Sequence, residues 1–291
     1  MKTILVTGAT GLLGTILVPY LKASGYKTIT HAQKNAADFL VDFSDTGKSF
    51  KILRQFNPSI IINLISLTSV DLCQSEPNMA YLANTRTVEN IVFWIQKTGA
   101  KCHLIQISTD HLYDGSVMNS ENEIAIRNVY AFSKYAAELA AARIPSSIIR
   151  TNFIGRSRTA HRESLSDWVY TSLVNGKKIQ VLDDVYFSPL AMSTLIKIIQ
   201  LMIEEKPIGV FNVGSHQGMS KADFAFAFAA SLKLPTHTMT CIGTQQSTFL
   251  KAYRPKEMRM DCSKFENAMG IRLPQFSDEI IRVAKEYDEL A

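Results

Sequence analysis

The chain has 291 residues, of which 46% are hydrophobic and 20% are charged, and its formal net charge is +5. This balance is typical of a soluble globular protein and excludes a chain that is disordered along its whole length. Lysine and arginine form no long run, which favours a mixed solvated surface over a nucleic-acid interface.

The cysteines and the first residues bear on the cellular compartment. The four cysteines lie far apart with no CxxC, so we predict reduced thiols, no disulfide framework and no zinc site. The apolar run at 4–6 is too short for a signal peptide or a membrane span. We therefore expect a cytoplasmic protein with neither a membrane nor a nucleic acid as its partner.

Short β-rich runs alternate with amphipathic segments through the first two-thirds of the chain. Strands separated by such helices form right-handed crossovers in a parallel sheet. The segment 59–63 is apolar on both faces, as in a central strand that helices cover on both sides. Strands are expected near 3–7, 27–31, 60–64, 103–107, 147–150 and 210–213, and helices over 12–23, 46–55, 79–98, 130–143 and 191–204.

The pattern loosens after residue 150, where Pro, Gly and polar stretches become frequent. Residues 1–150 are predicted to form the main domain, completed by strand and helix elements from about 181–234. Segments 151–180 and 235–291 are predicted to form a smaller interleaved lobe. The fold class is thus α/β, a Rossmann-type doubly wound parallel sheet with a smaller C-terminal lobe.

Three glycines follow the first strand with the spacing GxxGxxG. Glycines between a strand and a helix permit a tight turn and close approach of the backbone to a pyrophosphate, and the helix N-terminus supplies N–H groups. The position of the motif, directly between a predicted strand and a helix, favours a dinucleotide site over a simple turn. The predicted phosphate-site residues are Gly8, Thr10, Gly11, Leu12, Leu13 and Gly14.

The end of the second strand bears on the cofactor. An acidic residue there would bind the ribose hydroxyls of NAD, but residues 30–34 include no acid. Lys34, with His31 as a second candidate, would instead meet the 2′-phosphate of NADP, although Lys34 also fits an ordinary exposed loop lysine. We predict NADPH, with NADH as the alternative. Asp42 and Phe43, a carboxylate beside an aromatic ring, are candidates to flank the adenine.

Tyr130 and Lys134 stand four residues apart in a predicted helix and therefore share one face. A neighbouring ammonium group favours the phenolate and lowers the tyrosine pKa, as proton transfer near neutral pH requires. Ser108 and Thr109 follow a predicted strand, at the end where open α/β sheets bind ligands. A hydroxyl there can donate to a substrate carbonyl, and because the two residues point to opposite faces, we expect that only one serves.

These motifs resemble the extended short-chain dehydrogenase/reductases and, among them, the dTDP-4-dehydrorhamnose reductase family. The resemblance implies NADPH-dependent reduction of a nucleotide-linked 4-keto-6-deoxy-sugar, in nucleotide-sugar metabolism that serves dTDP-rhamnose and polysaccharide biosynthesis. It also implies that the smaller lobe binds the substrate. The similar stretches keep the family's order and span nearly the whole chain: 6–14, 58–63, 68–71, 75–77, 107–110, 113–115, 128–130, 133–134, 150–151, 254–255, 261–264 and 270–274.

The resemblance assigns roles to individual residues. Thr109, Tyr130 and Lys134 would form the catalytic triad, with Tyr130 as proton donor and Lys134 on the nicotinamide ribose. Asn84 would support the site. The residues implied to lie against the cofactor after the third main strand are Leu64, Ile65 and Ser66, which replace small alanines of the family. The residues implied on the substrate side are Thr68, Ser108, His111, Phe153 and Arg254.

Several positions depart from the family pattern. His111 stands where a tyrosine is usual, Phe153 where a tryptophan is common, and residues 188–190 replace a Pro-Thr pair. These positions shape the sugar pocket, so the sugar need not be rhamnose. Ile16 and Ser193 occupy the places of glutamates that bind magnesium at the dimer interface of some members, so no metal is expected.

Two other functions remain open from the sequence. One is a nucleotide-sugar epimerase or dehydratase that retains NAD, against which the missing acid after strand two argues. The other is a non-catalytic, NADP-binding regulatory subunit, against which the intact Thr-Tyr-Lys set argues. The sequence leaves the nucleotide, the sugar, the product stereochemistry and the oligomeric state undefined, with a homodimer as one possibility.

Overall fold

The computed structural model describes residues 3–34, 36–160 and 162–288. The chain divides into two compact units. Unit 1 holds residues 1–109, 128–150 and 196–211, and unit 2 holds 110–127, 151–195 and 212–291. Residues 110–127, expected in the main domain, therefore cluster with unit 2, and of the segment 181–234 only residues 196–211 join unit 1.

Unit 1 is built on a sheet with the strand order β11-β6-β5-β4-β1-β2-β3. The paired strands β3, β2, β1, β4, β5 and β6 all run parallel, which confirms the predicted fold class. The strands are β1 (Thr3–Thr7), β2 (Lys27–Ala32), β3 (Phe39–Leu40), β4 (Ile60–Asn63), β5 (His103–Ile107), β6 (Ser146–Thr151) and β11 (Gly209–Val213).

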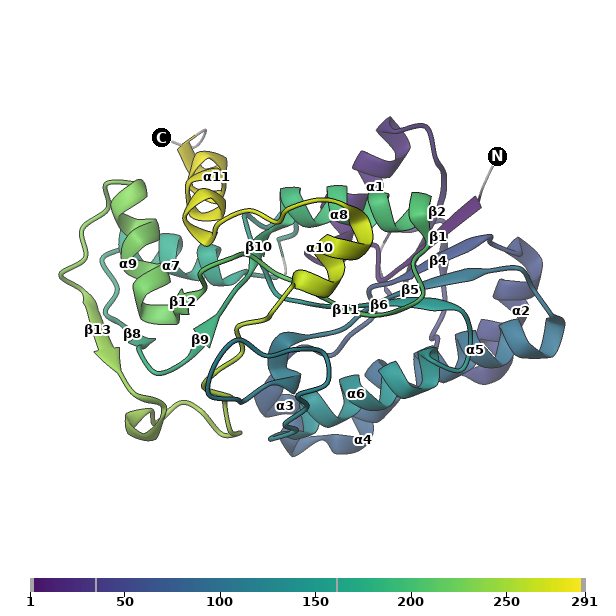
Figure 1. The fold of residues 1–291 in the computed structure, drawn as a ribbon, viewed down its shortest axis with the longest axis horizontal. Coiled ribbons are helices and arrows are strands. Elements are labelled where there is room, and N and C mark those ends of the chain that lie inside the picture. The colour runs from purple at the N-terminus through teal and green to yellow at the C-terminus, as the bar shows by residue number, and fades with distance from the viewer. Residues whose placement is uncertain (1–2, 35, 161, 289–291) are drawn as a thin grey trace. The chain divides into compact units, whose positions relative to one another are not determined.

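Helices cover both faces of this sheet, with α1 and α8 on one side and α2, α5 and α6 on the other (Figure 1). A buried apolar cluster lies between the sheet and the second group, with Leu5, Ile61 and Leu104 from the strands and Trp94 from α5. The helices are α1 (Gly14–Ala23), α2 (Thr46–Phe56), α3 (Val70–Ser75), α4 (Pro77–Ala80), α5 (Thr87–Thr98), α6 (Val129–Ala141) and α8 (Met192–Glu205), the last of which enters unit 1 at residue 196.

Local signals account for several of these helix boundaries. Asp45 caps α2 by accepting from the Lys48 N–H at 3.0 Å, and Asn128 caps α6 by accepting from the Ala131 N–H at 2.8 Å. Helix α5 ends at Gly99, whose φ of 65° suits glycine. The helix expected over 79–98 is divided, because residues Tyr81–Arg86 form a π-helical turn between α4 and α5.

Unit 2 has its own apolar core, in which Phe187, Phe224, Phe228 and Phe276 pack together. Its helices are α7 (Leu165–Val174), α9 (Lys221–Ser231), α10 (Ser263–Met269) and α11 (Phe276–Asp288). Its strands form three two-stranded sheets: β7 (Phe153–Ile154) with β10 (Leu190–Ala191), β9 (Tyr186–Phe187) with β12 (Met219–Ser220), and β8 (Ile179–Leu182) with β13 (Met239–Ile242). Short 3₁₀ turns lie at Asp110–Leu112 and Thr244–Gln246.

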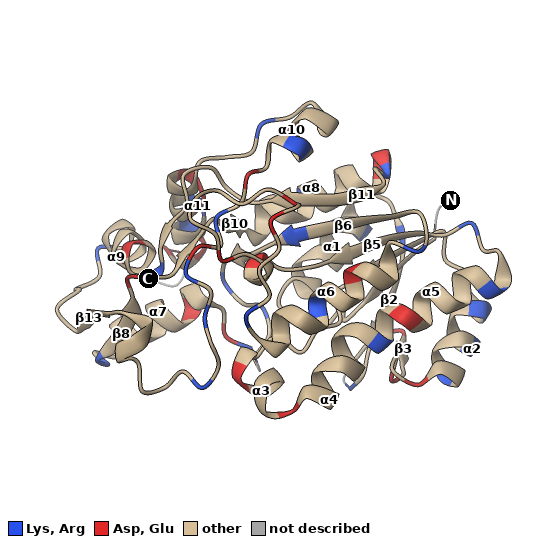
Figure 2. Ribbon diagram, turned by 60° about the horizontal axis from the view of Figure 1, so that its bottom comes forward, with Lys and Arg blue, Asp and Glu red and all other residues tan. Residues whose placement is uncertain are grey.

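Charged residues of both signs are interspersed along the helices and loops of each unit (Figure 2). This distribution agrees with the mixed surface expected from the sequence. Among the described residues, no helix is both long enough and apolar enough to cross a membrane.

Candidate functional site

The glycine turn lies where the strand order of unit 1 reverses. The chain runs from β1 outward to β2 and β3 and then returns to β4 on the other side of β1. Ligands of open α/β sheets bind at such a switch point, outside the carboxyl ends of the strands. Gly8 follows β1 with a φ of +69°, and a Cβ atom there would lie 3.0 Å from the backbone of Leu64 and Ile65, which follow β4. The two strand ends therefore approach each other closely.

The other two glycines shape the start of α1. The Gly11 N–H closes the turn on the Gly8 carbonyl at 3.0 Å. A Cβ atom on Gly14 would lie 2.5 Å from the Ala9 carbonyl oxygen, so no larger residue fits there without a shift of the backbone. The first turn of α1 carries no acidic residue, and Leu13 at the N-cap position offers no side-chain hydrogen bond. The N-terminal N–H groups and the positive dipole end are thus suited to an anion.

His31 has a structural role that the sequence did not indicate. Its Nδ1 accepts the Gly8 N–H at 3.4 Å, and its Nε2 lies 2.8 Å from the Val41 carbonyl oxygen. The ring also packs on Phe39 and Phe43, with centroids 5.2 and 4.5 Å apart. Burial lowers the His31 pKa, so the ring is neutral near pH 7. We therefore correct its assignment as a second phosphate-binding residue: His31 supports the glycine turn.

The other residues predicted to contact the cofactor after strand β2 are Lys34, Asp42 and Phe43, of which the first two are exposed and the third is buried. Lys34 is exposed, as a residue that meets a ligand phosphate must be. Asp42 is also exposed, and its Oδ1 accepts from the Ser44 N–H at 2.9 Å and the Ser44 hydroxyl at 2.7 Å. The Phe43 side chain is only 2% exposed and belongs to the core of unit 1. This placement argues against the predicted packing of the Phe43 ring on an adenine.

One acidic side chain, that of Asp38, does contact strand β2, although Asp38 lies after residues 30–34 in the sequence. The Oδ2 atom of Asp38 accepts from both the N–H and the hydroxyl of Thr30, each at 2.8 Å. These bonds, with the charge of Lys22, lower the Asp38 pKa. The sequence did not reveal this acid because it precedes the next strand, and its contact with Thr30 depends on the β2–β3 loop.

Helix α6 carries Tyr130 and Lys134 on one face, both buried. The Lys134 Nζ donates to the Ile107 carbonyl oxygen at 2.7 Å, which brings this face to the carboxyl end of β5. Burial lowers the Lys134 pKa to about 8, against the opposing charge of Glu138. Thr109 follows two residues after Ile107 and is 4% exposed. Lys134 on α6 thus lies at the carboxyl end of β5, which ends two residues before Thr109, and the catalytic roles of Thr109, Tyr130 and Lys134 stay a prediction.

Asn84 connects the loop after β4 to α6. Its Oδ1 accepts from the Leu67 N–H at 2.7 Å and the Ser66 hydroxyl at 3.0 Å. Its Nδ2 donates to the Leu67 carbonyl at 3.1 Å and to Ser133 Oγ at 2.9 Å. Asn84 lies in the π-helical turn, a local widening that is frequent at functional sites. Asn84 therefore holds the loop after β4 against α6, and its support of the catalytic site stays a prediction.

Ser108, predicted on the substrate side, has a protein side chain as its hydrogen-bond partner. Its hydroxyl donates to Glu138 Oε1, and the side chain is buried. The hydroxyl proton of Ser108 is therefore committed to a carboxylate, and the predicted contact of Thr109 with a substrate stays a prediction. Thr68, the other substrate-side residue predicted in unit 1, is exposed at the end of the loop before α3.

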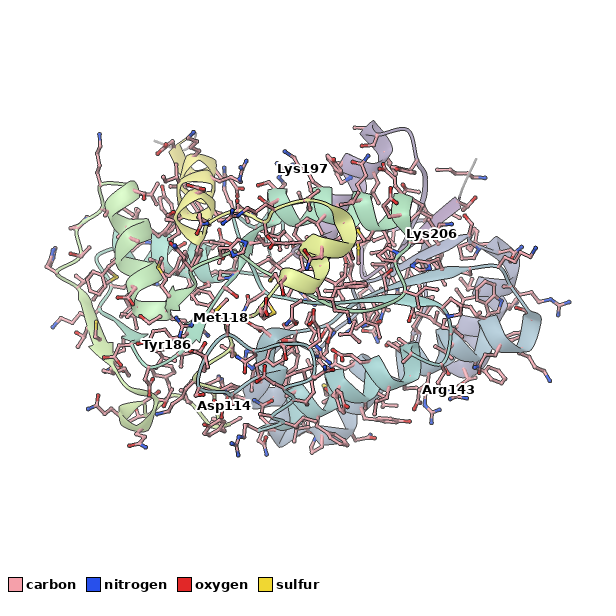
Figure 3. All side chains as sticks on the ribbon, viewed as in Figure 1. Asp114, Met118, Arg143, Tyr186, Lys197 and Lys206 are labelled. Atoms are coloured by element: carbon pink, nitrogen blue, oxygen red, sulfur yellow. The ribbon has the colours of Figure 1, made fainter. Side chains whose placement is uncertain are left out.

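The other predicted substrate-side residues lie in unit 2. Burial, with the nearby charges of Lys221 and Arg254, lowers the His111 pKa to about 3, so His111 is neutral. Phe153 is half-buried in β7. The segment that carries Arg254 is tied down by Asp114 (labelled in Figure 3), which accepts from the Tyr253 hydroxyl at 2.9 Å and the Lys256 N–H at 2.7 Å.

Lys221 is a candidate residue that the sequence did not reveal. It opens α9, its Nζ lies 6.0 Å from the centroid of the Phe187 ring, and burial lowers its pKa although the charge of Asp110 opposes this. A half-buried ammonium group near Arg254 and a neutral histidine suits an anionic or polar ligand. A lysine after a serine N-cap carries no sequence signal of such a role.

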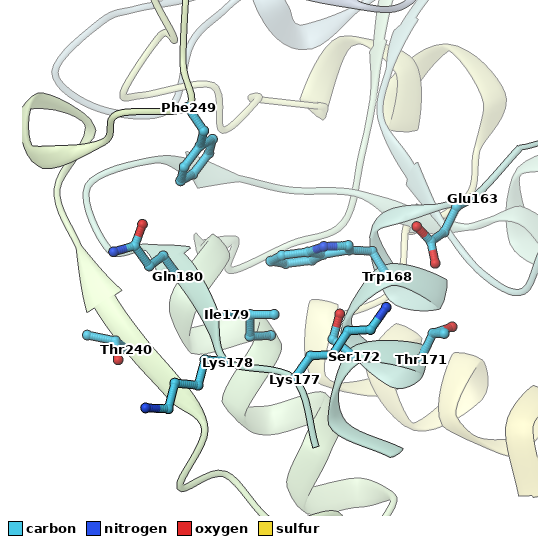
Figure 4. Close-up of a pocket in the computed structure, with 10 residues that line it drawn as sticks. All are labelled: Glu163, Trp168, Thr171, Ser172, Lys177, Lys178, Ile179, Gln180, Thr240 and Phe249. Atoms are coloured by element: carbon cyan, nitrogen blue, oxygen red, sulfur yellow. The ribbon is translucent and has the colours of Figure 1, made fainter. Parts of the chain in front are cut away.

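Unit 2 also contains a cavity of about 780 Å³, within the range of small-molecule sites. Trp168 of α7 lies in the cavity with Phe249 across from it, and Lys177 and Lys178 lie at the opposite side from Phe249 (Figure 4). Aromatic faces suit a planar base, and ammonium groups suit phosphates. The lining residues are Glu163, Trp168, Thr171, Ser172, Lys177, Lys178, Ile179, Gln180, Thr240 and Phe249.

Within the described ranges, no three His, Cys, Asp or Glu side chains form a group that would hold a metal ion. The candidate site presents hydroxyl, phenol and ammonium groups, from Thr109, Tyr130 and Lys134.

Comparison with known proteins gives matches along the whole chain. The family model described as the RmlD substrate binding domain matches residues 1–289. A probable low-salt glycan biosynthesis reductase, Agl14 of Haloferax volcanii, is 24% identical over 94% of this chain and 95% of its own. Methionine adenosyltransferase 2 subunit beta of Mus musculus is also 24% identical, over 94% of this chain and 84% of its own length.

Among solved structures, the dTDP-4-dehydrorhamnose reductase of Bacillus anthracis in complex with NADP is similar with a TM-score of 0.88. The match covers 98% of this chain and 100% of that one at 23% identity. The likeness supports the α/β fold that the sheet order of unit 1 shows.

Proposed function

The chain belongs to the RmlD substrate binding domain family, which confirms the resemblance seen in the sequence, and from this we propose that it is an NADPH-dependent reductase of a nucleotide-linked 4-keto-6-deoxy-sugar. One observation carries the proposal. Lys134, one helical turn after Tyr130, is anchored by its Nζ to the Ile107 carbonyl, next to Thr109 at the ligand-binding end of the sheet.

The residues at the switch point fit a dinucleotide. Gly8 and Gly14 lie where a side chain would collide with backbone, and the uncapped start of α1 offers N–H groups to a pyrophosphate. Exposed Lys34 would bind the 2′-phosphate that distinguishes NADPH from NADH, and Lys134 would hold the nicotinamide ribose. When bound, NADPH supplies the hydride. The NADP complex of the Bacillus anthracis relative supports this assignment.

The side chains of this chain would handle the proton. Thr109 would donate a hydrogen bond to the substrate carbonyl and hold it beside Tyr130. Tyr130 would give its phenolic proton to the C4 oxygen as negative charge develops there. The Lys134 ammonium, with a pKa of about 8, is mainly charged at neutral pH and would lower the Tyr130 pKa toward that range.

The substrate assignment has support from unit 2. His111, Phe153 and Arg254 would face the sugar, and the departure of His111 and Phe153 from the family's usual residues would set which sugar fits. The cavity beside Trp168 would take the base of the nucleotide, with Lys177 and Lys178 near its phosphates. Relatives named as a glycan biosynthesis reductase and a dTDP-4-dehydrorhamnose reductase fit a nucleotide-sugar substrate.

A second candidate function is that of a non-catalytic subunit. It is favoured by the match to methionine adenosyltransferase 2 subunit beta, which resembles this chain over nearly all of it. The complete Thr109, Tyr130 and Lys134 set favours the reductase, because a purely binding subunit does not need a buried lysine beside a tyrosine.

The two functions separate in one experiment. The purified protein is mixed with NADPH and a panel of dTDP-, UDP- and GDP-linked 4-keto-6-deoxy-sugars, and the loss of NADPH absorbance is followed with product identification by mass spectrometry. We expect turnover of at least one member of the panel, abolished in Tyr130→Phe. Tight NADPH binding without turnover of any sugar would support the non-catalytic subunit instead.

A further inference from the structure

A buried ion pair lies on the same face of α6 as Tyr130 and Lys134, one helical turn beyond the lysine. Arg150 of β6 meets Glu138 of α6 through two parallel contacts, Nε to Oε1 at 3.0 Å and Nη2 to Oε2 at 2.6 Å. Both side chains are only 3% exposed. Such a bidentate pair fixes the carboxylate in one orientation.

The same carboxylate is joined to the strand that anchors Lys134. Glu138 is one helical turn beyond Lys134, and its Oε1 accepts the hydroxyl of Ser108. The residue before Ser108 is Ile107, whose carbonyl accepts from Lys134 Nζ at 2.7 Å. Lys134 and Glu138 of α6 thus hydrogen-bond to the adjacent residues Ile107 and Ser108 at the end of β5. Together with the helix backbone, these two bonds close a ring of contacts that includes the lysine.

Glu138 is also the charge that opposes the desolvation of Lys134. Burial lowers the Lys134 pKa to about 8, and the charge of Glu138 acts in the opposite direction. Cys73 of α3 is the other titratable neighbour, but burial raises its thiol pKa to about 11, so it is neutral near pH 7. The adjoining π-helical turn contributes Asn84 and Thr85, which do not titrate, and Arg150 carries a further positive charge.

We propose that Glu138, oriented by Arg150, is a positioning residue of the reaction: it keeps the Lys134 ammonium charged and fixes the end of β5 on which that ammonium is held. The proposal rests on the proposed roles of Tyr130 and Lys134. It assigns to Glu138 no contact with substrate or cofactor, so its effect is transmitted through Lys134. A buried pair of this kind is weak evidence of stability alone, because apolar replacements of such pairs are often neutral or stabilising.

The direct test is the titration of Lys134 in protein labelled with ¹³C at the lysine ε-carbons, with the Lys134 signal identified by its loss in Lys134→Met. In Glu138→Gln, which keeps the shape but removes the charge, we expect the Lys134 titration to move down by about one pH unit. The control is Glu257→Gln in unit 2, which breaks a partly buried carboxylate–arginine pair, with Arg259 Nε 2.8 Å from Glu257 Oε1. This control should leave the Lys134 titration unchanged.

The pH profile of reduction gives a second, independent measurement. If the Lys134 pKa falls from about 8 to about 7, the charged fraction near pH 8 falls from about one-half to about one-tenth. In Glu138→Gln, kcat/KM near pH 8 should therefore fall about fivefold, with its alkaline limb displaced to lower pH. Ser108→Ala removes the anchoring hydrogen bond without a change of charge, so it should lower kcat while the limb stays in place.

The outcomes distinguish this inference from the proposed function. An unshifted Lys134 titration in Glu138→Gln, or an equal shift in Glu257→Gln, overturns the inference even if the enzyme reduces a sugar. If the wild-type protein reduces no sugar, the proposed function fails, while the titration still decides whether Glu138 controls the lysine. If Glu138→Gln does not fold, Glu138→Asp serves instead: it keeps the charge and should preserve the titration, and a full shift in that variant overturns the inference.

Discussion

Replacement of Lys134 by methionine should make the protein more stable and inactive at once. Lys134 is 3% exposed, and the pKa of about 8 of its ammonium group in the folded protein compares with 10.5 for an unperturbed lysine. The difference of 2.5 pH units corresponds to about 3 kcal/mol that burial of the charge costs the folded state. Methionine fills a similar volume without the charge but leaves the Ile107 carbonyl without its donor, a loss of about 1–2 kcal/mol. The net stabilisation expected at neutral pH is about 1–2 kcal/mol.

The pH dependence of stability gives the sign of this effect. Below about pH 8 the lysine is protonated in both states, so the cost of burial is present in full; it is relieved as the pH rises from about 8 toward 10.5. The wild-type protein should therefore gain about 2–3 kcal/mol relative to Lys134→Met between pH 7 and pH 10. Urea unfolding followed by circular dichroism at both pH values measures this difference.

The matched control is Lys197→Met, which replaces an exposed lysine on α8 in the same unit (Figure 3). A surface substitution of this kind should change the free energy of unfolding by less than about 0.5 kcal/mol at either pH. If Lys134→Met were less stable than the wild type at pH 7 and kept the wild-type pH dependence, Lys134 would not be a buried charge and the electrostatic reasoning about the site would be refuted.

Three further predictions concern activity. Tyr130→Phe should lower kcat by about 10²–10⁴-fold with NADPH binding retained, measured by stopped-flow oxidation and fluorescence titration, and full activity would contradict its role as proton donor. Lys34→Asp should shift cofactor preference from NADPH toward NADH in the same titration, whereas an unchanged ratio would mean that Lys34 is an ordinary loop residue. Replacement of Trp168 by alanine should raise KM for the nucleotide sugar about tenfold with kcat nearly kept, and an equal KM would place the base elsewhere.

The central sheet could be predicted because its signals are local. Residues 60–62 are isoleucines that helices cover on both sides, so the segment is apolar throughout and reads as a buried strand. The glycines of the β1–α1 turn were equally visible, since Gly8 and Gly14 occupy places where a side chain would meet backbone. The helix carrying Tyr130 and Lys134 was likewise predicted from the sequence, over 130–143, and in the structure it is capped by Asn128.

The parts that escaped prediction depend on contacts between distant residues. His31 was named as a second candidate for the phosphate because the sequence does not show its bonds to Gly8 and Val41. Phe43 was predicted to flank an adenine for a similar reason: its packing on His31 forms only when β2 and the segment after β3 come together in the fold. The helices of unit 2 were missed because turn residues surround them; α9, for example, is apolar on nearly every face, so no amphipathic period marks it.

The wide turn at Tyr81–Arg86 limits how this region of the protein can change over time. A π-helical turn holds one residue more than a regular α-helical turn, and here Asn84 lies within it, bonded to Leu67 on one side and Ser133 on the other. Deletion of a single residue would restore a regular helix but would rotate Asn84 by about 100° away from both partners. A point substitution cannot remove the extra residue of the π-helical turn. Related proteins in which Asn84 bonds both the loop at Leu67 and the helix at Ser133 must therefore also keep that extra residue. Residue count within 81–86 should then be as diagnostic of this site as the identity of Asn84 itself.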